Sequence, residues 1–479
     1  MKTRILSLLP LVVCFAISHV WGQTDLMLGI PDGIPSLGPS GILYIVKNTN
    51  DTPDANPGDG ICADASGNCT LRAAVDDSNA NGAPADVIIF ELPYPSIIEL
   101  TQGELNLNDP ALKIVGPGAR RLTIRRGSAS RLFSVTNTQE RSLTAIWRLR
   151  LEGSSASSLI SGGAVRVSPG ASLDLAEVWF AGNSAGNGGA VSNEGTLSIT
   201  RSLFTGNSAV NDGGALHLAA GSVTVLTNST LTLNSAATGG AVYAAGSIIS
   251  ANNAITHNAA TAAASSIASA SGSSVNALNT IIGADTSLPV TTITGTFISL
   301  GNNLVTDARA ASGFTNGVNG DQVGDNNAID PMLGALTDNG GQTDTRALLP
   351  GSPAIDHGNS CVAEGACAVT IPRLRWDQRT RHTRRALSSG AIVDIGAFES
   401  GSTIMNSSFG MIGGFFPNVG PRRIGFVFAI DATTGIRQTT VLRSSGSYRF
   451  SNLDPGEVYI FEHHVKNRPT GPLVLPLGF

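Results

Sequence analysis

The sequence predicts an all-β protein: a right-handed parallel β-helix with an N-terminal helical cap and a small C-terminal β-sandwich. Three observations lead to this fold. The 479-residue chain holds 56 Gly but only 30 Lys and Arg and 35 Asp and Glu, and 5% of it is aromatic. That composition disfavours a helical bundle. Short motifs recur about every 25 residues, and apolar residues alternate between them, which indicates strands.

The first 22 residues have the pattern of a Sec-type signal peptide. Lys2 and Arg4 precede an apolar run from Ile5 to Ile17, and small residues precede the cleavage point. A membrane anchor is the alternative, but the run is shorter than the roughly 20 residues that span a bilayer. We therefore expect export, a linker over residues 23–43, and no transmembrane segment in the mature chain.

A helix is predicted just before the first coil. Leu71, Ala74 and Val75 share one helical face within the segment from Cys69 to Ala80. The end of a β-helix is an open sheet edge, so we expect this helix to cap it. The β-helix itself is predicted over residues 44–400.

Two motifs repeat in phase through the middle of the chain. Gly-Gly-Ala recurs at steps of 26, 25 and 26 residues, beginning at Gly162, Gly188, Gly213 and Gly239. An Asn recurs at steps of 24, 27 and 24 residues, as Asn183, Asn207, Asn234 and Asn258. Two markers that keep phase indicate a structural repeat.

A parallel β-helix accounts for this period, because it is too short for a propeller blade and lacks the leucine-rich pattern. Successive coils would stack at about 4.8 Å, so the Asn side chains are expected to form an amide ladder. Gly-Gly would permit a corner with positive φ, and Ala would fit where the chain turns inward. The right-handed winding follows the general rule for parallel crossovers. A β-sandwich with coincidental repeats is the alternative.

Four cysteines remain once the signal peptide, which contains Cys14, is removed. They form two local pairs, Cys62 with Cys69 and Cys361 with Cys367. In an exported protein such pairs suggest disulfides. A zinc site made from all four is the alternative, although neither pair has the usual zinc spacing.

The C-terminal residues 410–479 predict a small antiparallel β-sandwich, preceded by a linker rich in Ser, Gly and Asn over residues 401–409. Turn residues separate four strand-like runs, which are Ile424 to Ile430, Gln438 to Leu442, Tyr448 to Phe450 and Val458 to His463.

Several motifs resemble known families. The segments Asn50-Asp-Thr and Cys69-Thr-Leu-Arg-Ala-Ala resemble the CSLREA motif of exported bacterial β-helix proteins, with Ala73 where that motif has Glu. The repeats resemble those of polymorphic outer-membrane proteins. Segments of residues 330–399, among them Asp394-Ile-Gly-Ala-Phe-Glu399, resemble the choice-of-anchor domain. Residues 446–459 resemble the carboxypeptidase-regulatory-like β-sandwich. These resemblances imply export and surface display, but no agreed catalytic residues.

A polysaccharide lyase or glycoside hydrolase of the pectin-lyase-like class is the rival interpretation. Hydrolysis needs two carboxylates within about 5 to 10 Å, yet no charged residue occurs between Gly213 and Ala284. Asp174 and Glu177 are the pair that comes nearest to this requirement. His217 and His257 are expected to be ordinary surface residues, and Arg166 and Arg201 lack an acidic cluster that would hold calcium. We assign no catalytic residue.

Two arginine runs and two acidic loops are further candidate binding segments. Arg with neighbouring aromatics can grip acidic polysaccharide or nucleic acid, but we expect solvated loops paired with acidic turns such as Asp356 and Asp394. The runs are Arg120, Arg121, Arg125, Arg126 and Arg131, and Arg373, Arg375, Arg379, Arg381, Arg384 and Arg385. Turn formation explains the acidic loops better than calcium binding does. These loops contain Asp51, Asp54, Asn56 and Asp59, and Asp321, Asp325, Asn326, Asn327 and Asp330.

The function predicted from sequence is a secreted or surface-displayed scaffold that adheres to cells, matrix or glycan, or is structural. Repeated coils would present Ser, Thr and Asn side chains at fixed spacing, which suits weak multivalent contacts. The formal charge of −5 gives no nucleic-acid footprint, so polysaccharide or a host surface is the expected partner. No cofactor and no metal are expected, and the binding residues are not identified.

Overall fold

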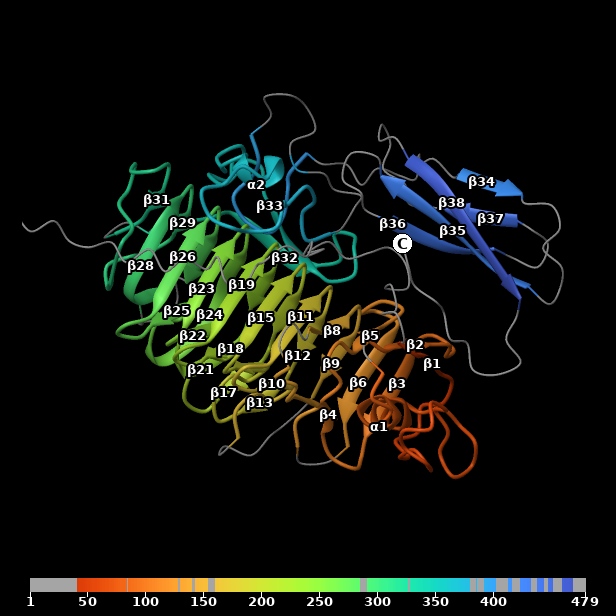
Figure 1. The fold of residues 1–479 in the computed structure, drawn as a ribbon. Coiled ribbons are helices and arrows are strands. Elements are labelled where there is room, and N and C mark those ends of the chain that lie inside the picture. Colours follow the sequence, from red (N-terminus) through yellow and green to blue (C-terminus); the bar gives the residue numbers. More distant parts are fainter. Residues whose placement is uncertain are drawn as a thin grey trace, which may run out of the picture. The chain divides into compact units, whose positions relative to one another are not determined.

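The computed structural model is a stack of parallel strands that wind as a solenoid (Figure 1). It describes residues 41–401 and then the strand residues 412–415, 423–431, 437–442, 447–450 and 459–467. Within 41–401 the gaps are 84, 128–129, 140–142, 154–159, 285–290, 326–327, 380–384 and 386–391. The predicted signal peptide, most of the 23–43 linker, and nearly all of the 401–409 linker lie outside the described residues.

Parallel pairing from coil to coil builds three long faces, which we call A, B and C, and a shorter face D. Face A contains β1 (Leu43–Val46), β2 (Val87–Phe90), β5 (Lys113–Val115), β8 (Thr144–Trp147), β11 (Ser172–Ala176), β15 (Thr196–Thr200), β19 (Val223–Thr227), β23 (Ser247–Ala251), β26 (Ser274–Leu278) and β28 (Ile293–Gly301). Face B contains β3 (Ser96–Leu100), β6 (Leu122–Arg126), β9 (Arg150–Glu152), β12 (Trp179–Ala181), β16 (Leu203–Thr205), β20 (Thr230–Thr232), β24 (Ala254–Ala263), β27 (Ile281–Ala284), β29 (Leu304–Val305) and β31 (Gln322–Val323).

Face C contains β4 (Leu105–Leu107), β7 (Phe133–Val135), β10 (Val165–Val167), β14 (Val191–Asn193), β18 (Leu216–Leu218), β22 (Val242–Ala244) and β25 (Ile267–Ser269), and continues into the start of β28, which also pairs with β30 (Ala311–Ser312). Face D contains β13 (Ser184–Ala185), β17 (Ser208–Ala209), β21 (Ser235–Thr238) and the end of β24. These pairings confirm the parallel β-helix; its right-handed winding stays a prediction.

The interior is filled by apolar side chains stacked in columns. Leu173 and Leu175 of β11 are buried and lie beside Leu197 and Ile199 of the next coil. On face B the rings of Phe180 and Phe204 stack with centroids 4.5 Å apart. Each coil therefore buries its alternate residues on its neighbours, which is the physical reason a repeat of this kind needs several copies.

The Gly-Gly-Ala corners serve the purpose predicted for them. Gly188 has φ +60°, and a Cβ at Gly189 would collide with the carbonyl oxygens of Ser208 and Gly214. Ala190, which follows, is fully buried. Only glycine permits this close approach between coils.

The predicted amide ladder is present and completely buried. In each step an Asn Nδ2 donates to the Oδ1 of the Asn in the next coil, at 2.9 Å in all three steps; the chain of bonds runs Asn183, Asn207, Asn234 and Asn258. The same Oδ1 atoms also accept backbone N–H groups, as Asn207 Oδ1 does from Asn183 at 3.1 Å. We call these four residues the inner ladder.

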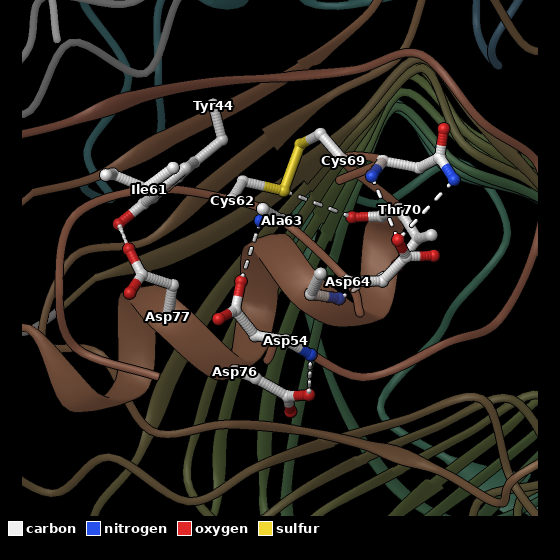
Figure 2. The surroundings of a disulfide bond; sticks show 12 residues. Tyr44, Asp54, Ile61, Cys62, Ala63, Asp64, Cys69, Thr70, Asp76 and Asp77 are labelled. Carbon is white, nitrogen blue, oxygen red and sulfur yellow. Dashed lines mark hydrogen bonds between the residues drawn. A yellow bond between two sulfur atoms is a disulfide. The ribbon is translucent and has the colours of Figure 1, made fainter. Parts of the chain in front are cut away.

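The helix α1 (Leu71–Ala80) forms within the predicted segment. The Thr70 side chain accepts a hydrogen bond from the N–H of Ala73, which caps its first turn. Leu71, Ala74 and Val75 are buried in the main core cluster. The Cys62–Cys69 disulfide closes the loop that leads into the helix, and the Tyr44 hydroxyl donates to Asp77 at 2.6 Å (Figure 2).

Residues 331–400, which we call the strap, differ from the coils. The predicted range of 44–400 includes a C-terminal region that resembles the choice-of-anchor domain, and parallel coil pairing among the described residues ends before it, at β31. The strap instead contains an antiparallel hairpin of β32 (Leu333–Thr337) and β33 (Thr345–Leu348) and a short helix, α2 (Cys361–Glu364). These elements lie alongside the coils (Figure 1). The Cys361–Cys367 disulfide is present, so both predicted disulfides are confirmed.

Apolar side chains of the strap cover outward-facing residues of the solenoid. One cluster joins Ala251 and Leu278 of face A to Val362, Leu374 and Val393 of the strap. A second joins Ile281 and Leu304 of face B to strap residues Leu348, Ala354 and Ile395. The strap is therefore held on two faces at once, which explains why its apolar residues do not follow the coil period.

In the part of the chain after the strap that the structure describes, five strands form two antiparallel sheets. β34 (Ile412–Phe415) pairs with β37 (Ser447–Phe450), and β35 (Arg423–Asp431) lies between β36 (Arg437–Leu442) and β38 (Tyr459–Asn467). Four of them coincide with predicted strands, and β34 was not predicted.

Candidate functional site

Face C carries one outward side chain per coil, because β10, β14, β18 and β22 have three residues each and bury the first and last. The middle residues are in register from coil to coil. They are Arg166, Ser192, His217 and Tyr243, and we call them the outer row. Ala268 of β25 is the next position along the row.

Arg166 is held in place by a bidentate ion pair. Its Nε and Nη2 atoms donate to the two carboxylate oxygens of Glu194 at 2.7 and 2.8 Å. Hydrogen bonding to this guanidinium lowers the pKa of Glu194. A second pair, Arg131 Nε to Glu104 Oε2 at 2.6 Å, lies near the start of the row. Both pairs combine opposite charges, so the cations here are already compensated.

His217 and Tyr243 form a ring pair. Their centroids are 5.6 Å apart and their planes are within 2° of parallel. Burial lowers the pKa of His217, although the carboxylates of Asp212 and Glu194 act in the opposite direction. The imidazole is therefore neutral at pH 7, and it stacks as an uncharged ring.

Two polar atoms of the outer row have no hydrogen-bond partner among the described residues. They are the Ser192 Oγ, on a side chain that is almost wholly buried, and His217 Nδ1. Arg131 Nη1 is in the same condition. Buried polar atoms are normally paired, but such unpartnered atoms also occur on faces A and B, for example Asp174 Oδ1 and Trp179 Nε1, so they do not set face C apart.

Asp174 and Glu177, the carboxylates considered for catalysis, have other partners. Asp174 Oδ2 accepts from the Trp147 indole at 2.8 Å, and burial raises the pKa of Asp174. Glu177 lies at a corner with φ +56° and pairs with Arg148 at 2.9 Å and with Arg201 at 3.4 Å. The two carboxylates therefore interact with different partners, Asp174 with an indole and Glu177 with two guanidinium groups. His257 lies at another corner, with φ +56°, directly before the last rung of the inner ladder.

Several arginines of the two runs form ion pairs. In the N-terminal run, Arg125 pairs with Glu99 at 2.8 Å, and Arg120 pairs with Asp344 of the strap at 2.6 Å. In the strap run, Arg385 is fully buried and pairs with Glu399 at 2.8 Å. The expected solvated loop is therefore wrong for Arg385.

Arg379 is likewise nearly buried. It pairs with Asp377 at 2.6 Å and lies over the Phe398 ring at 3.7 Å. Arg381 and Arg384 lie outside the described residues.

The N-terminal acidic loop forms turns and contacts, as expected. Asp54 accepts from the N–H groups of Asn56 and Ala63 at 2.8 and 2.9 Å. Asp51 pairs with Arg72 at 2.7 Å, which joins the two segments that resemble the CSLREA motif. In the described part of the chain, no three His, Cys, Asp or Glu residues gather as metal ligands would. Of the described helices, none is long and apolar enough to cross a bilayer.

One comparison with known families gives a match. Residues 201–219 match the Chlamydia polymorphic membrane protein repeat. This segment includes the Asn207 rung of the inner ladder, a Gly-Gly-Ala corner and His217 of the outer row. Neither the curated proteins nor the solved structures that were compared give a match.

The outer row was not recognised from the sequence, although a signal exists. Each member is the second residue after a Gly-Gly-Ala triplet, in the order Arg166, Ser192, His217, Tyr243. Alternation predicts that this position faces outward. The residue at this position differs in each coil although its orientation stays the same. The outer row therefore gives each coil a different surface.

Proposed function

We propose that this protein is a surface-displayed or secreted β-helix scaffold with an adhesive or structural role toward cells, matrix or glycan. The observation that carries the proposal is the unbroken parallel stack, which presents polar side chains in straight rows at the strand spacing. Rows of this kind support many weak contacts at once. The polymorphic membrane protein repeat at residues 201–219 supports a surface location.

In this proposal residues 1–22 direct export as a signal peptide, and α1 caps the first coil. Support for the cap comes from Leu71, Ala74 and Val75, which join the solenoid core, and from Arg72, whose Nη2 donates to the carbonyl of Gly103 at 2.7 Å. An apolar core that ends at water is costly, and an amphipathic helix covers it. The C-terminal strands form a carboxypeptidase-regulatory-like sandwich that serves as a spacer or attachment module.

The test is fractionation of the native host, followed by glycan-array and cell-binding assays. Two chains are compared: the mature chain, and one that ends at Ser400. We expect the protein at the surface or in the medium, with binding retained by the shorter chain. A protein that stays soluble in the medium and binds neither cells nor glycans would contradict the adhesive role.

The same preparation tests the alternative, a polysaccharide lyase or glycoside hydrolase. Incubation with pectins, alginate and glycosaminoglycans is followed by reducing-end and absorbance measurements of unsaturated products. Robust turnover would replace the scaffold proposal with the enzymatic one. Loss of that turnover in Asp174→Asn would then assign the role of that carboxylate.

A further inference from the structure

The outer row is one side chain wide, and this width restricts what it can bind. Each of its strands offers a single outward residue, and successive residues lie about 4.8 Å apart along the solenoid axis. A globular partner needs a broad patch of about 800 Å² on each side. A linear polymer that runs along the solenoid axis would instead pass over every residue of the outer row.

Small residues lie on both sides of the ring pair. Ser192 precedes His217 in the row, and Ala268 follows Tyr243. One face of each ring contacts the other ring, and the next residue of the row on the other side of Tyr243 is the small Ala268. An aromatic ring with an uncovered face presents an apolar surface beside polar groups.

The polar groups along the row suit hydroxyl groups. Beyond Ser192, the Arg166–Glu194 pair offers donors and acceptors fixed in one plane. That pair is partly exposed, whereas Ser192 Oγ and His217 Nδ1 are buried and take no part in the proposed contact. A planar donor and acceptor pair and an aromatic ring in one row match the two sides of the sugar rings of one chain, their hydroxyls and their C–H faces.

Charge selects the class of sugar. The positive charges of Arg166 and Arg131 are paired with Glu194 and Glu104, and Asp212 adds a further negative charge. A uronate or sulfated polymer would meet no free cation in this row and would be repelled by Asp212. A neutral chain meets no such penalty.

We propose that the outer row of face C binds a neutral polysaccharide chain laid along the solenoid axis, with a sugar ring against the free face of Tyr243 and hydroxyls on the Arg166–Glu194 pair. This inference rests on the proposed adhesive function and names its ligand class. It places the glycan on face C and not on the strap or the coil corners.

The experiment measures binding of the full mature chain by calorimetry. Soluble β-glucan, galactomannan and dextran are the neutral probes, and alginate and heparin are the anionic ones. Tyr243→Ala removes the ring and Arg166→Met removes the guanidinium. The control is Val223→Ala, which changes an exposed side chain on face A. We expect binding to at least one neutral probe, a tenfold or greater loss in each row variant, and no change in the control. Thermal unfolding of each variant confirms that it is folded.

The outcomes separate this inference from the proposed function. If Tyr243→Ala and Arg166→Met bind the neutral probes as the wild type does, the outer row is not the binding site. If the wild type binds only the anionic probes, the proposed ligand class is wrong. The proposed adhesive function stands in either case. Cell adhesion that persists after enzymatic removal of cell-surface glycans identifies a protein partner and also overturns the inference. If the wild-type chain binds neither cells nor any probe, the proposed function fails with it.

Discussion

Two columns of asparagines run along the same solenoid and behave differently. The inner ladder, Asn183 to Asn258, is buried inside the coils and its amides bond to one another. The second column, at the corner between faces A and B, has positive φ in every member and faces outward; its members are Asn228, Asn252, Asn279 and Asn302. We call it the outer column.

The outer column bonds chiefly to the strap. Asn228 Nδ2 donates to the carbonyl of Trp376 at 2.7 Å, and Asn302 Nδ2 donates to that of His357 at 2.8 Å. Asn279 exchanges two hydrogen bonds with Asn359, at 2.7 and 3.0 Å. The same residue type at nearly the same period thus joins coil to coil on the inside and coil to strap on the outside.

The orientation of a repeated asparagine, inward or outward, therefore decides what it stabilises. Inner amides satisfy each other wherever coils stack, so this column needs no other segment. Outer amides are buried only because the strap covers them, and without it they would bond to water. The inner ladder therefore belongs to the stability of the solenoid, and the outer column to the docking of the strap.

The largest expected effect is that of Asn207→Ala in the inner ladder. The change leaves the Asn183 N–H and Nδ2 groups and the carbonyl of Phe180 short of partners. Each buried unpaired group costs about 1–3 kcal/mol, so we expect a loss of about 4 kcal/mol in the free energy of unfolding by denaturant titration. Asn211→Ala, at an exposed position in the same coil, is the control and should stay within about 0.5 kcal/mol. Equal losses of stability in Asn207→Ala and Asn211→Ala would show that the inner ladder has no special role in stabilising the solenoid.

Breaking the buried ion pair of the strap is expected to have the next largest effect. Arg385 Nη1 donates to Glu399 at 2.8 Å, and Arg385 Nη2 donates to the Gly396 carbonyl and to Asn228 Oδ1. Arg385→Met leaves a buried carboxylate unpaired, which costs about 3 kcal/mol or more. Limited proteolysis should then cut within 331–400 while the coils stay intact. Cleavage of the coils at the same rate would show that the strap and solenoid unfold together.

Asn279→Ala in the outer column is expected to cost about 1.5 kcal/mol, less than the inner change. It removes two hydrogen bonds to Asn359 and one to Asn252, each worth about 0.5–1.5 kcal/mol net, and the strap can admit water at this edge. Denaturant titrations of Asn279→Ala and Asn207→Ala in the same buffer compare their losses in the free energy of unfolding. A larger loss for Asn279→Ala than for Asn207→Ala would reverse our assignment.

The smallest expected effect is a dependence on pH that belongs to the strap. Burial raises the pKa of Glu399 to about 7, partly offset by Arg385. Since the folded state holds this proton more tightly than the unfolded chain does, the stabilisation is present at low pH and is lost as pH rises through 7. We expect the free energy of unfolding of the strap to fall by about 1 kcal/mol between pH 6 and pH 8. Glu399→Gln should flatten this slope, and a slope that persists in it would assign the titration to another group.

Much of the solenoid could be predicted because a repeat exposes its own geometry. The period, the Gly-Gly-Ala corners, the Asn183 to Asn258 ladder and both disulfides followed from residues whose role is local to a coil or a short loop. The strap could not be predicted from the same reasoning. Its contacts with the outer column join residues 55 to 148 positions apart, from Asn302 with His357 to Asn228 with Trp376, and no local pattern encodes such a pairing. The outer column was missed for the same cause, because its partner lies in the strap.

Native-state hydrogen exchange of Asn252→Ala/Asn279→Ala tests most directly whether the outer column docks the strap independently of the coils. We predict faster exchange in strap residues 354–378 and 392–400, with the protection of coil residues 223–284 unchanged. If coil exchange accelerates as much as strap exchange, or if the strap keeps its full protection, the two asparagine columns do not have the separate roles assigned to them.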